Sequence, residues 1–143
     1  MASDETAIQQ LLNRYTQSAN AYDHHGVAST FTDDGEWNLT SMDKIMKGRG
    51  DIVATASRVS EKFSLMVLIN SPAAIEVDGD CATAISTVRE SARLAETGAA
   101  IEILGRYEDR LVRTAAGWRF AERKFSMLSM QHVQASDVKL PAE

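Results

Sequence analysis

The first part of the chain carries apolar residues at the spacing of an amphipathic helix. They recur at intervals of three and four, which places them on one face of a helix of about four to five turns. Ser3 precedes this segment as a candidate N-cap. Asp23 predicts the N-cap of a second, short helix that ends near Phe31. The residues of the apolar stripe are Ile8, Leu11, Leu12, Tyr15, Ala19 and Tyr22.

Turn and cap signals then predict one strand and a third helix. The Asp-Gly pair at 34–35 predicts a turn before a strand at 36–40. Asp51 follows two glycines that flank Arg49 and is the predicted N-cap of the third helix. The apolar positions of that helix are Ile52, Ala56 and Val59.

The second half of the chain has the pattern of an antiparallel meander. Its turns are predicted at the glycine-containing pairs 78–79, 97–98 and 116–117. Helices followed by a run of strands indicate an α+β protein, with the helices packed on one face of a curved sheet. We expect one domain over 1–130 and an irregular tail over 131–143. The predicted strands are 64–71, 74–77, 81–92, 100–113 and 118–130.

Charge and composition narrow the function classes. The net charge is −5 and there is no basic stripe, which argues against a nucleic-acid partner. A single cysteine, Cys81, excludes an intramolecular disulfide and a cysteine-based zinc site. The adjacent histidines His24 and His25 lack the spacing of a helical metal pair, so we expect no metal. Neither a secretory leader nor a membrane-spanning run is evident, so we expect a cytoplasmic protein with no membrane partner.

Several polar residues are candidates for chemistry. Arg123 shares a strand face with apolar residues and either forms a structural ion pair or points into a cavity. Tyr107 is either a core residue or a pocket hydroxyl, on a strand that Gly105 is expected to bend. His25 is a candidate acid or base, although adjacent histidines on a short helix are usually solvated. Glu90 could supply a buried carboxylate, as could Glu102, although single strand carboxylates usually face water.

Five segments together resemble the SnoaL-like branch of the nuclear-transport-factor-2-like superfamily. They cover roughly residues 5–130. The resemblance implies a cone-shaped α+β barrel, in which N-terminal helices pack on a strongly curved, mainly antiparallel sheet. It also implies kinship with cofactor-independent lyases: scytalone dehydratase, bile-acid 7α-dehydratase and hexachlorocyclohexane dehydrochlorinase. The segments are AIQQLLNRY, DHHGVASTFTDDGEW, KGRGDI, IEVDGDCATA and GRYEDRLVRTAAGWRFAER.

The resemblance places family site positions on this chain, with two departures. The acid–base Asp of the bile-acid and hexachlorocyclohexane lyases falls on Asn20, and their His falls on Met66. An amide has no useful pKa near neutrality and a thioether cannot transfer a proton, so this pair cannot perform the family's chemistry. Tyr15, Trp37 and Arg123 match family positions.

The sequence therefore predicts a cofactor-independent lyase or isomerase that acts on a small hydrophobic cyclic or aromatic molecule in a deep pocket. The reaction would be elimination, isomerisation, cyclisation or retro-aldol release. The alternative is a non-catalytic binding or structural module of the same fold. The resemblance also implies a homo-oligomer, a trimer or a dimer. The expected catalytic residues are Tyr15, Asn20, Arg123 and His25, and the expected substrate-binding residues are Trp37, Met66, Tyr107, Phe125 and Met127.

Overall fold

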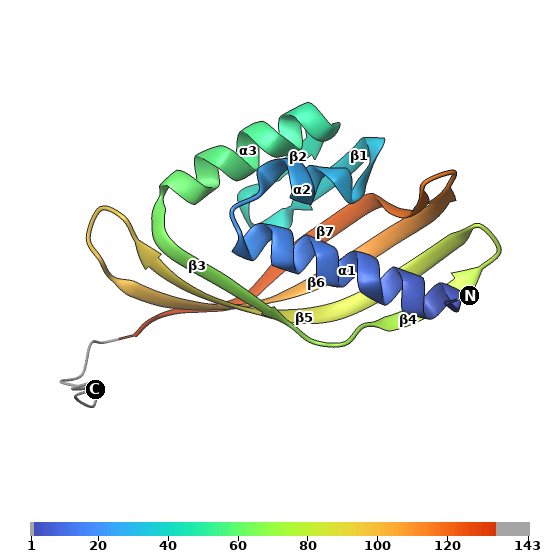
Figure 1. The fold of residues 1–143 in the computed structure, drawn as a ribbon. Helices are drawn as coiled ribbons and strands as arrows, with labels where there is room; N and C mark the ends of the chain where they lie inside the picture. Colours follow the sequence, from blue (N-terminus) through green and yellow to red (C-terminus); the bar gives the residue numbers. More distant parts are fainter. Residues whose placement is uncertain (1, 134–143) are drawn as a thin grey trace, which may run out of the picture.

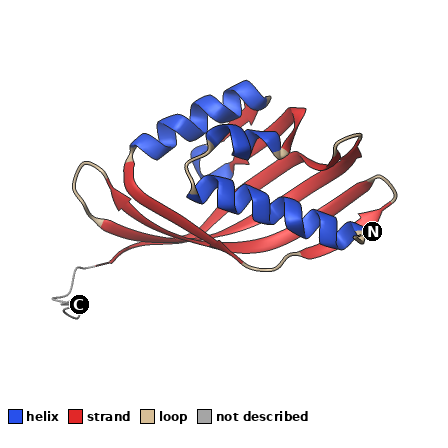
Figure 2. Cartoon of the chain, in the orientation of Figure 1, coloured by secondary structure: helices blue, strands red, loops and turns tan. Residues whose placement is uncertain are grey.

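The computed structural model describes residues 2–133, which form a curved sheet with helices on one side (Figures 1 and 2). The α+β class and the mainly antiparallel sheet are as predicted. The helices are α1 (Asp4–Asn20), α2 (His24–Ser29) and α3 (Arg49–Glu61), with a 3-10 turn η1 (Thr40–Met42). The strands are β1 (Phe31–Leu39), β2 (Lys44–Lys47), β3 (Phe63–Asn70), β4 (Ala74–Asp78), β5 (Cys81–Leu94), β6 (Ala100–Thr114) and β7 (Gly117–Val133).

The seven strands lie in one sheet in the order β2-β1-β7-β6-β5-β3, and β4 also pairs with β5. All pairs are antiparallel except β1 with β7, which is parallel. The first strand of the chain therefore lies beside the last. At the other side, β3 pairs with the end of β5 and β4 with its beginning. Glu90 of β5 lies directly between Leu68 of β3 and Ile103 of β6.

Two of the three predicted N-caps are confirmed, those at Ser3 and Asp23. Ser3 Oγ accepts a hydrogen bond from the Thr6 amide at 3.1 Å, and Asp23 Oδ1 accepts one from the Gly26 amide at 2.9 Å. Each cap satisfies an amide that the first helical turn leaves unpaired. The predicted apolar stripe of α1 is buried from Ile8 to Tyr15 and packs on the sheet. Its last member, Tyr22, lies beyond the helix in a left-handed backbone conformation (φ 57°).

Two local predictions were wrong, and one strand was missed. The Asp-Gly pair at 34–35 makes no turn before the strand, because β1 already begins at Phe31 and absorbs the pair where its register with β7 shifts. α3 begins after Gly48, and Asp51 lies inside its first turn, where it complements the helix dipole without capping. Strand β2 was not predicted at all; its four residues carry a single buried side chain, Met46.

The end of the chain departs from its prediction in part. Strand β7 continues to Val133, three residues into the predicted irregular tail, and pairs there with the start of β6. The rest of that tail, 134–143, lies outside the described residues.

The predicted bend at Gly105 is confirmed, since the register of β6 with β7 shifts between Leu104 and Gly105. A Cβ atom at Gly105 would overlap the ring of Phe125 on β7. The missing side chain therefore lets an aromatic ring cover the backbone where the sheet curves.

Candidate functional site

A largely apolar cavity of about 230 Å³ lies between the helices and the sheet. Its walls come from all three helices and from five strands, so residues far apart in sequence meet there. Six predicted site residues line it: Tyr15, Trp37, Met66, Tyr107, Phe125 and Met127. Ser60, Tyr22, His24 and Glu90 also line it and add polar groups. Asn20, His25 and Arg123 are not among the lining residues.

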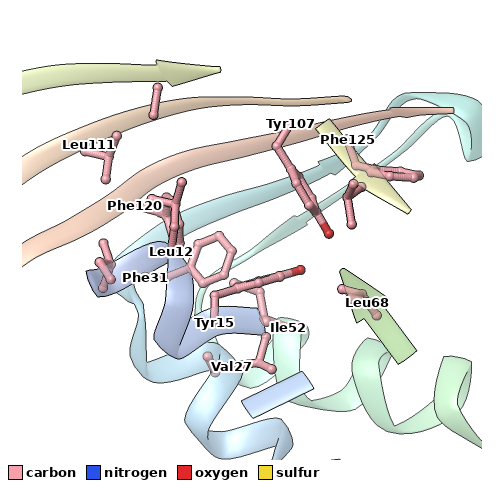
Figure 3. Packing of buried hydrophobic residues seen from close by; sticks show 14 of the residues in the cluster. Leu12, Tyr15, Val27, Phe31, Ile52, Leu68, Tyr107, Leu111, Phe120 and Phe125 are labelled. Carbon is pink, nitrogen blue, oxygen red and sulfur yellow. The ribbon is translucent and has the colours of Figure 1, made fainter. Parts of the chain in front are cut away.

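Tyr15 of α1 and Tyr107 of β6 form the floor of the cavity. Their rings pack edge to face, with centroids 5.9 Å apart, and both residues are buried. Figure 3 shows the two hydroxyl oxygens pointing into the same gap between helix and strand. Burial is the main cause that raises the pKa of each phenol, so both stay protonated at neutral pH. They can therefore donate hydrogen bonds to a ligand.

Arg123 of β7 lies behind this floor and is fully buried. Its guanidinium carbon lies 3.6 Å from the ring centre of Tyr107 and 4.1 Å from that of Tyr15. Its Nε is 3.2 Å from Oδ1 of Asp109, which is also buried. Of the two roles weighed for Arg123, the geometry is that of a structural ion pair.

The charge of Arg123 still acts on the site through its neighbours. It lowers the pKa of the two phenols, against the larger upward effect of burial. Burial also raises the pKa of Asp109 to about 6, although the Arg123 charge opposes it. Among the described residues, none of the three guanidinium nitrogens of Arg123 and neither carboxyl oxygen of Asp109 has a hydrogen-bond partner, so the two groups are held as an ion pair without a hydrogen bond. The aromatic rings therefore hold this cation largely by cation–π contact.

Asn20 connects the end of α1 to strand β3. Its Nδ2 donates to the Leu68 carbonyl oxygen at 2.9 Å, and its Oδ1 accepts from the Leu68 amide at 2.7 Å. A neighbouring strand would form the same pair of hydrogen bonds with the backbone of Leu68. The Asn20 amide therefore covers part of an otherwise open sheet edge. The structure thus occupies both ends of the Asn20 amide with the backbone of Leu68.

Of the two adjacent histidines, only His24 lines the cavity. His25 is exposed on α2 and does not line the cavity. The Nε2 of His24 lies 3.3 Å from the hydroxyl oxygen of Ser60 on α3. The sequence offered no basis for choosing between two neighbours, because the short helix has no apolar stripe that fixes its inner face.

Glu90, a candidate buried carboxylate but not one of the residues predicted to be catalytic, faces this cavity. Burial alone raises its pKa to about 7. No hydrogen bond or ion pair holds its carboxyl among the described residues. Alternation on β5 is the signal that could have identified it, since Val88 and Ala92, two residues to either side, are buried. Glu102, by contrast, is bound by Arg89 at 3.2 Å and by Ser91 at 2.8 Å.

Trp37 also brings an unpaired group to this region. Its indole Nε1 is buried without a hydrogen-bond partner among the described residues. A ligand acceptor could satisfy it. The part of the chain that the structure describes contains no group of three His, Cys, Asp or Glu residues able to hold a metal. None of the described helices is both long and apolar enough to span a membrane.

The sequence matches a family profile described as a SnoaL-like domain over residues 1–124, so the chain belongs to the SnoaL-like domain family. No curated protein sequence matches it. Solved structures share the fold across nearly the whole chain. A type 2 hexachlorocyclohexane dehydrochlorinase (LinA) superposes with a TM-score of 0.86 at 21% identity, covering 96% of this chain and 94% of the other.

Two further solved structures have the same fold. A candidate scytalone dehydratase from Novosphingobium aromaticivorans DSM 12444 has a TM-score of 0.80 at 22% identity, with 96% of this chain and 94% of the other covered. A Mycobacterium tuberculosis protein of unknown function has a TM-score of 0.75 at 28% identity, with 85% and 70% covered. The chain therefore has the nuclear-transport-factor-2-like fold that dehydrochlorinases and dehydratases share.

Proposed function

We propose that the protein is a cofactor-independent lyase or isomerase that moves a proton on a small, largely apolar ring molecule, with Glu90 as the proton acceptor. One observation carries the proposal. A single carboxyl group without an ion-pair partner among the described residues faces an apolar cavity, and burial raises its pKa to about 7. Such a group is half ionised near neutral pH and can both take and return a proton.

The proposed reaction uses the groups around the cavity in defined roles. The Glu90 carboxylate takes a proton from a carbon next to a carbonyl, and the electron pair of that C–H bond moves toward the carbonyl oxygen. Tyr15 and Tyr107 donate hydrogen bonds to the oxygen as it becomes negative. The protonated Glu90 then returns the proton to another carbon, which isomerises the ring, or to a departing hydroxyl, which completes an elimination.

In this proposal the four residues expected to be catalytic have roles that differ from those the sequence suggested. Tyr15 keeps the role of hydrogen-bond donor, and Arg123 acts through the two tyrosines as a positioning residue. Asn20 holds β3 in place, and neither it nor His25 is assigned a step. Trp37, Met66, Tyr107, Phe125 and Met127 form the proposed binding surface.

Deuterium exchange tests the proposal without knowledge of the natural substrate. Cyclohexanone and 2-cyclohexenone are incubated with the protein in D₂O, and deuterium uptake next to the carbonyl is followed by mass spectrometry. We expect protein-dependent exchange that Glu90→Gln abolishes and Glu102→Gln leaves unchanged. Exchange that persists in Glu90→Gln would refute the role of Glu90.

The alternative is a non-catalytic binding module, which the absence of the family's Asp/His pair at Asn20 and Met66 favours. It predicts that ring ketones bind in the cavity with no exchange above the buffer rate. Ligand-detected NMR on the same samples separates the two functions, because binding without exchange supports only the module.

We also propose that the protein assembles as a homo-oligomer, a trimer or a dimer, through the outer face of its sheet. Ile69, Ile85 and Leu104 are apolar side chains exposed on strands of that sheet. Light scattering after size exclusion measures the mass, and Leu104→Lys should shift it toward the monomer. A monomeric wild-type protein would overturn this assembly.

A further inference from the structure

We propose that His24 and Ser60 form a second polar subsite, which binds a hydrogen-bond donor on the ligand, a hydroxyl in the simplest case, at the end away from Glu90. This inference rests on the proposed function and specifies its substrate class. Both residues line the cavity, from helices α2 and α3, whereas Glu90 belongs to the sheet. Figure 1 shows these two helices over the sheet. Because Glu90 belongs to β5, the helices and the sheet contribute the two groups from different walls of the cavity.

Hydrogen counting fixes the direction of the bond between the two residues. A serine hydroxyl has one hydrogen to donate. The Ser60 hydroxyl lies 2.8 Å from the carbonyl oxygen of Ser57, which can only accept, and 3.3 Å from Nε2 of His24. The shorter contact takes the hydrogen, so Ser60 accepts from His24. Nε2 of His24 therefore carries a hydrogen.

This bond determines what the other ring nitrogen of His24 can do. In a neutral imidazole only one nitrogen carries a hydrogen. With the hydrogen on Nε2, Nδ1 has a free lone pair and acts as an acceptor. No described residue donates a hydrogen bond to it. A ligand hydroxyl is the complementary group, and Ser60 is the residue that keeps His24 in the accepting tautomer.

The rest of the cavity limits the ligand that can use this acceptor. The lining between the two walls is apolar and aromatic, from Trp37, Phe63 and Phe125 among others. A cavity of about 230 Å³ lies below the usual range of roughly 300–1,000 Å³ for small-molecule pockets. These features together favour a small, monocyclic molecule with an apolar body, a hydroxyl toward His24 and the reacting carbon toward Glu90.

The tautomer is measured first, on the ligand-free protein labelled with ¹⁵N-histidine. Proton–nitrogen correlation spectra should place the hydrogen of neutral His24 on Nε2. In Ser60→Ala the preference for this tautomer should weaken. His132, exposed on β7, provides an internal reference. A hydrogen found on Nδ1 in the wild-type protein would overturn the inference.

Binding is measured with two probes that differ by one methyl group on the phenolic oxygen, which removes the donor. 4-Methylphenol can donate to Nδ1, and 4-methylanisole cannot. The phenol should bind more tightly and shift the Nδ1 resonance of His24. In His24→Phe the phenol should lose about two- to tenfold in affinity, the usual range for one hydrogen bond, while the anisole changes less than twofold. The matched control His25→Phe, at the exposed neighbour, should change neither.

Three results overturn the subsite: equal affinity for the two probes, an equal loss of both in His24→Phe, or no binding of either at millimolar concentration. Thermal unfolding of each variant shows that the fold is intact. The outcome is independent of Glu90, because the same preference for the phenol should remain in Glu90→Gln. Exchange that survives in Glu90→Gln refutes the proposed reaction and leaves the His24 subsite standing.

Discussion

Replacement of Glu90 by glutamine should remove a large part of the pH dependence of stability. Burial raises the pKa of this carboxyl from 4.5 to about 7 in the folded protein. Below about pH 4.5 the Glu90 carboxyl is protonated in both the folded and the unfolded chain, so it carries no charge whose burial would lower the free energy of unfolding. As the pH rises, the unfolded chain ionises first, so the folded state loses stability until the pH reaches about 7.

The size of this loss follows from the two pKa values. Their difference is about 2.5, and each pKa unit corresponds to about 1.4 kcal/mol, so the upper limit is about 3 kcal/mol. The glutamine variant has no charge to desolvate at this position. Its free energy of unfolding, taken relative to the wild type, should therefore rise by up to about 3 kcal/mol between pH 4 and pH 8.

Urea unfolding of both proteins at half-unit pH intervals measures this difference. Glu102→Gln is the matched control, because its carboxylate is bound to Arg89 and lies on an accessible part of the sheet. Its difference from the wild type should stay within about 0.5 kcal/mol, as for most surface substitutions. A Glu90→Gln difference that does not change with pH would show that the carboxyl is solvated, and the proposed base would then lose its physical support.

Other substitutions test the packing around the site, each by the free energy of unfolding. Arg123→Met should destabilise the fold by about 3–5 kcal/mol because it leaves the buried carboxylate of Asp109 without its cation. The double variant with Asp109→Leu should recover part of this loss. Equal losses in the single and the double variant would argue against a coupled pair. Gly105→Ala should cost about 1–3 kcal/mol through overlap with the facing aromatic ring, and an unchanged stability would mean that the ring moves freely. Asn20→Asp should cost about 1–3 kcal/mol, since it replaces the donor to the Leu68 carbonyl by an oxygen. It should not raise the exchange rate above that of the wild type, and a faster exchange would restore Asn20 to the site.

Much of the fold could be predicted because local signals and the buried faces agreed. The N-caps at Ser3 and Asp23 and the stripe on α1 are short-range features, and the structure bears them out. The failures occurred where long-range pairing decided the outcome. An Asp-Gly pair usually turns the chain, but at 34–35 it lies within a strand that pairs with β7, about 85 residues further along. Strand β2 is too short and too exposed to give a pattern.

The site was harder to predict for a similar reason. The resemblance pointed to Asn20 and Arg123. In the structure, however, the Asn20 side chain binds the backbone of Leu68, and the Arg123 side chain contacts Asp109 and aromatic rings. Which of two adjacent histidines faces inward depends on how α2 meets α3, which no local pattern records. The inward side of Glu90 was readable from strand alternation. That no described residue places a cation beside it depends on the packing of three neighbouring strands.

The parallel pairing of β1 with β7 has a consequence for how the protein is made. Trp37 of β1 lies beside Arg123 of β7, so the N-terminal quarter of the chain lacks its neighbour until the last strand has been synthesised. Contacts of such long sequence separation slow folding, because a large loop must close before they form. During synthesis α1 and β1 therefore leave the ribosome with apolar faces uncovered. The cavity can take shape only when the chain is nearly complete, and nascent chains that stop before β7 should be recognised by chaperones and degraded.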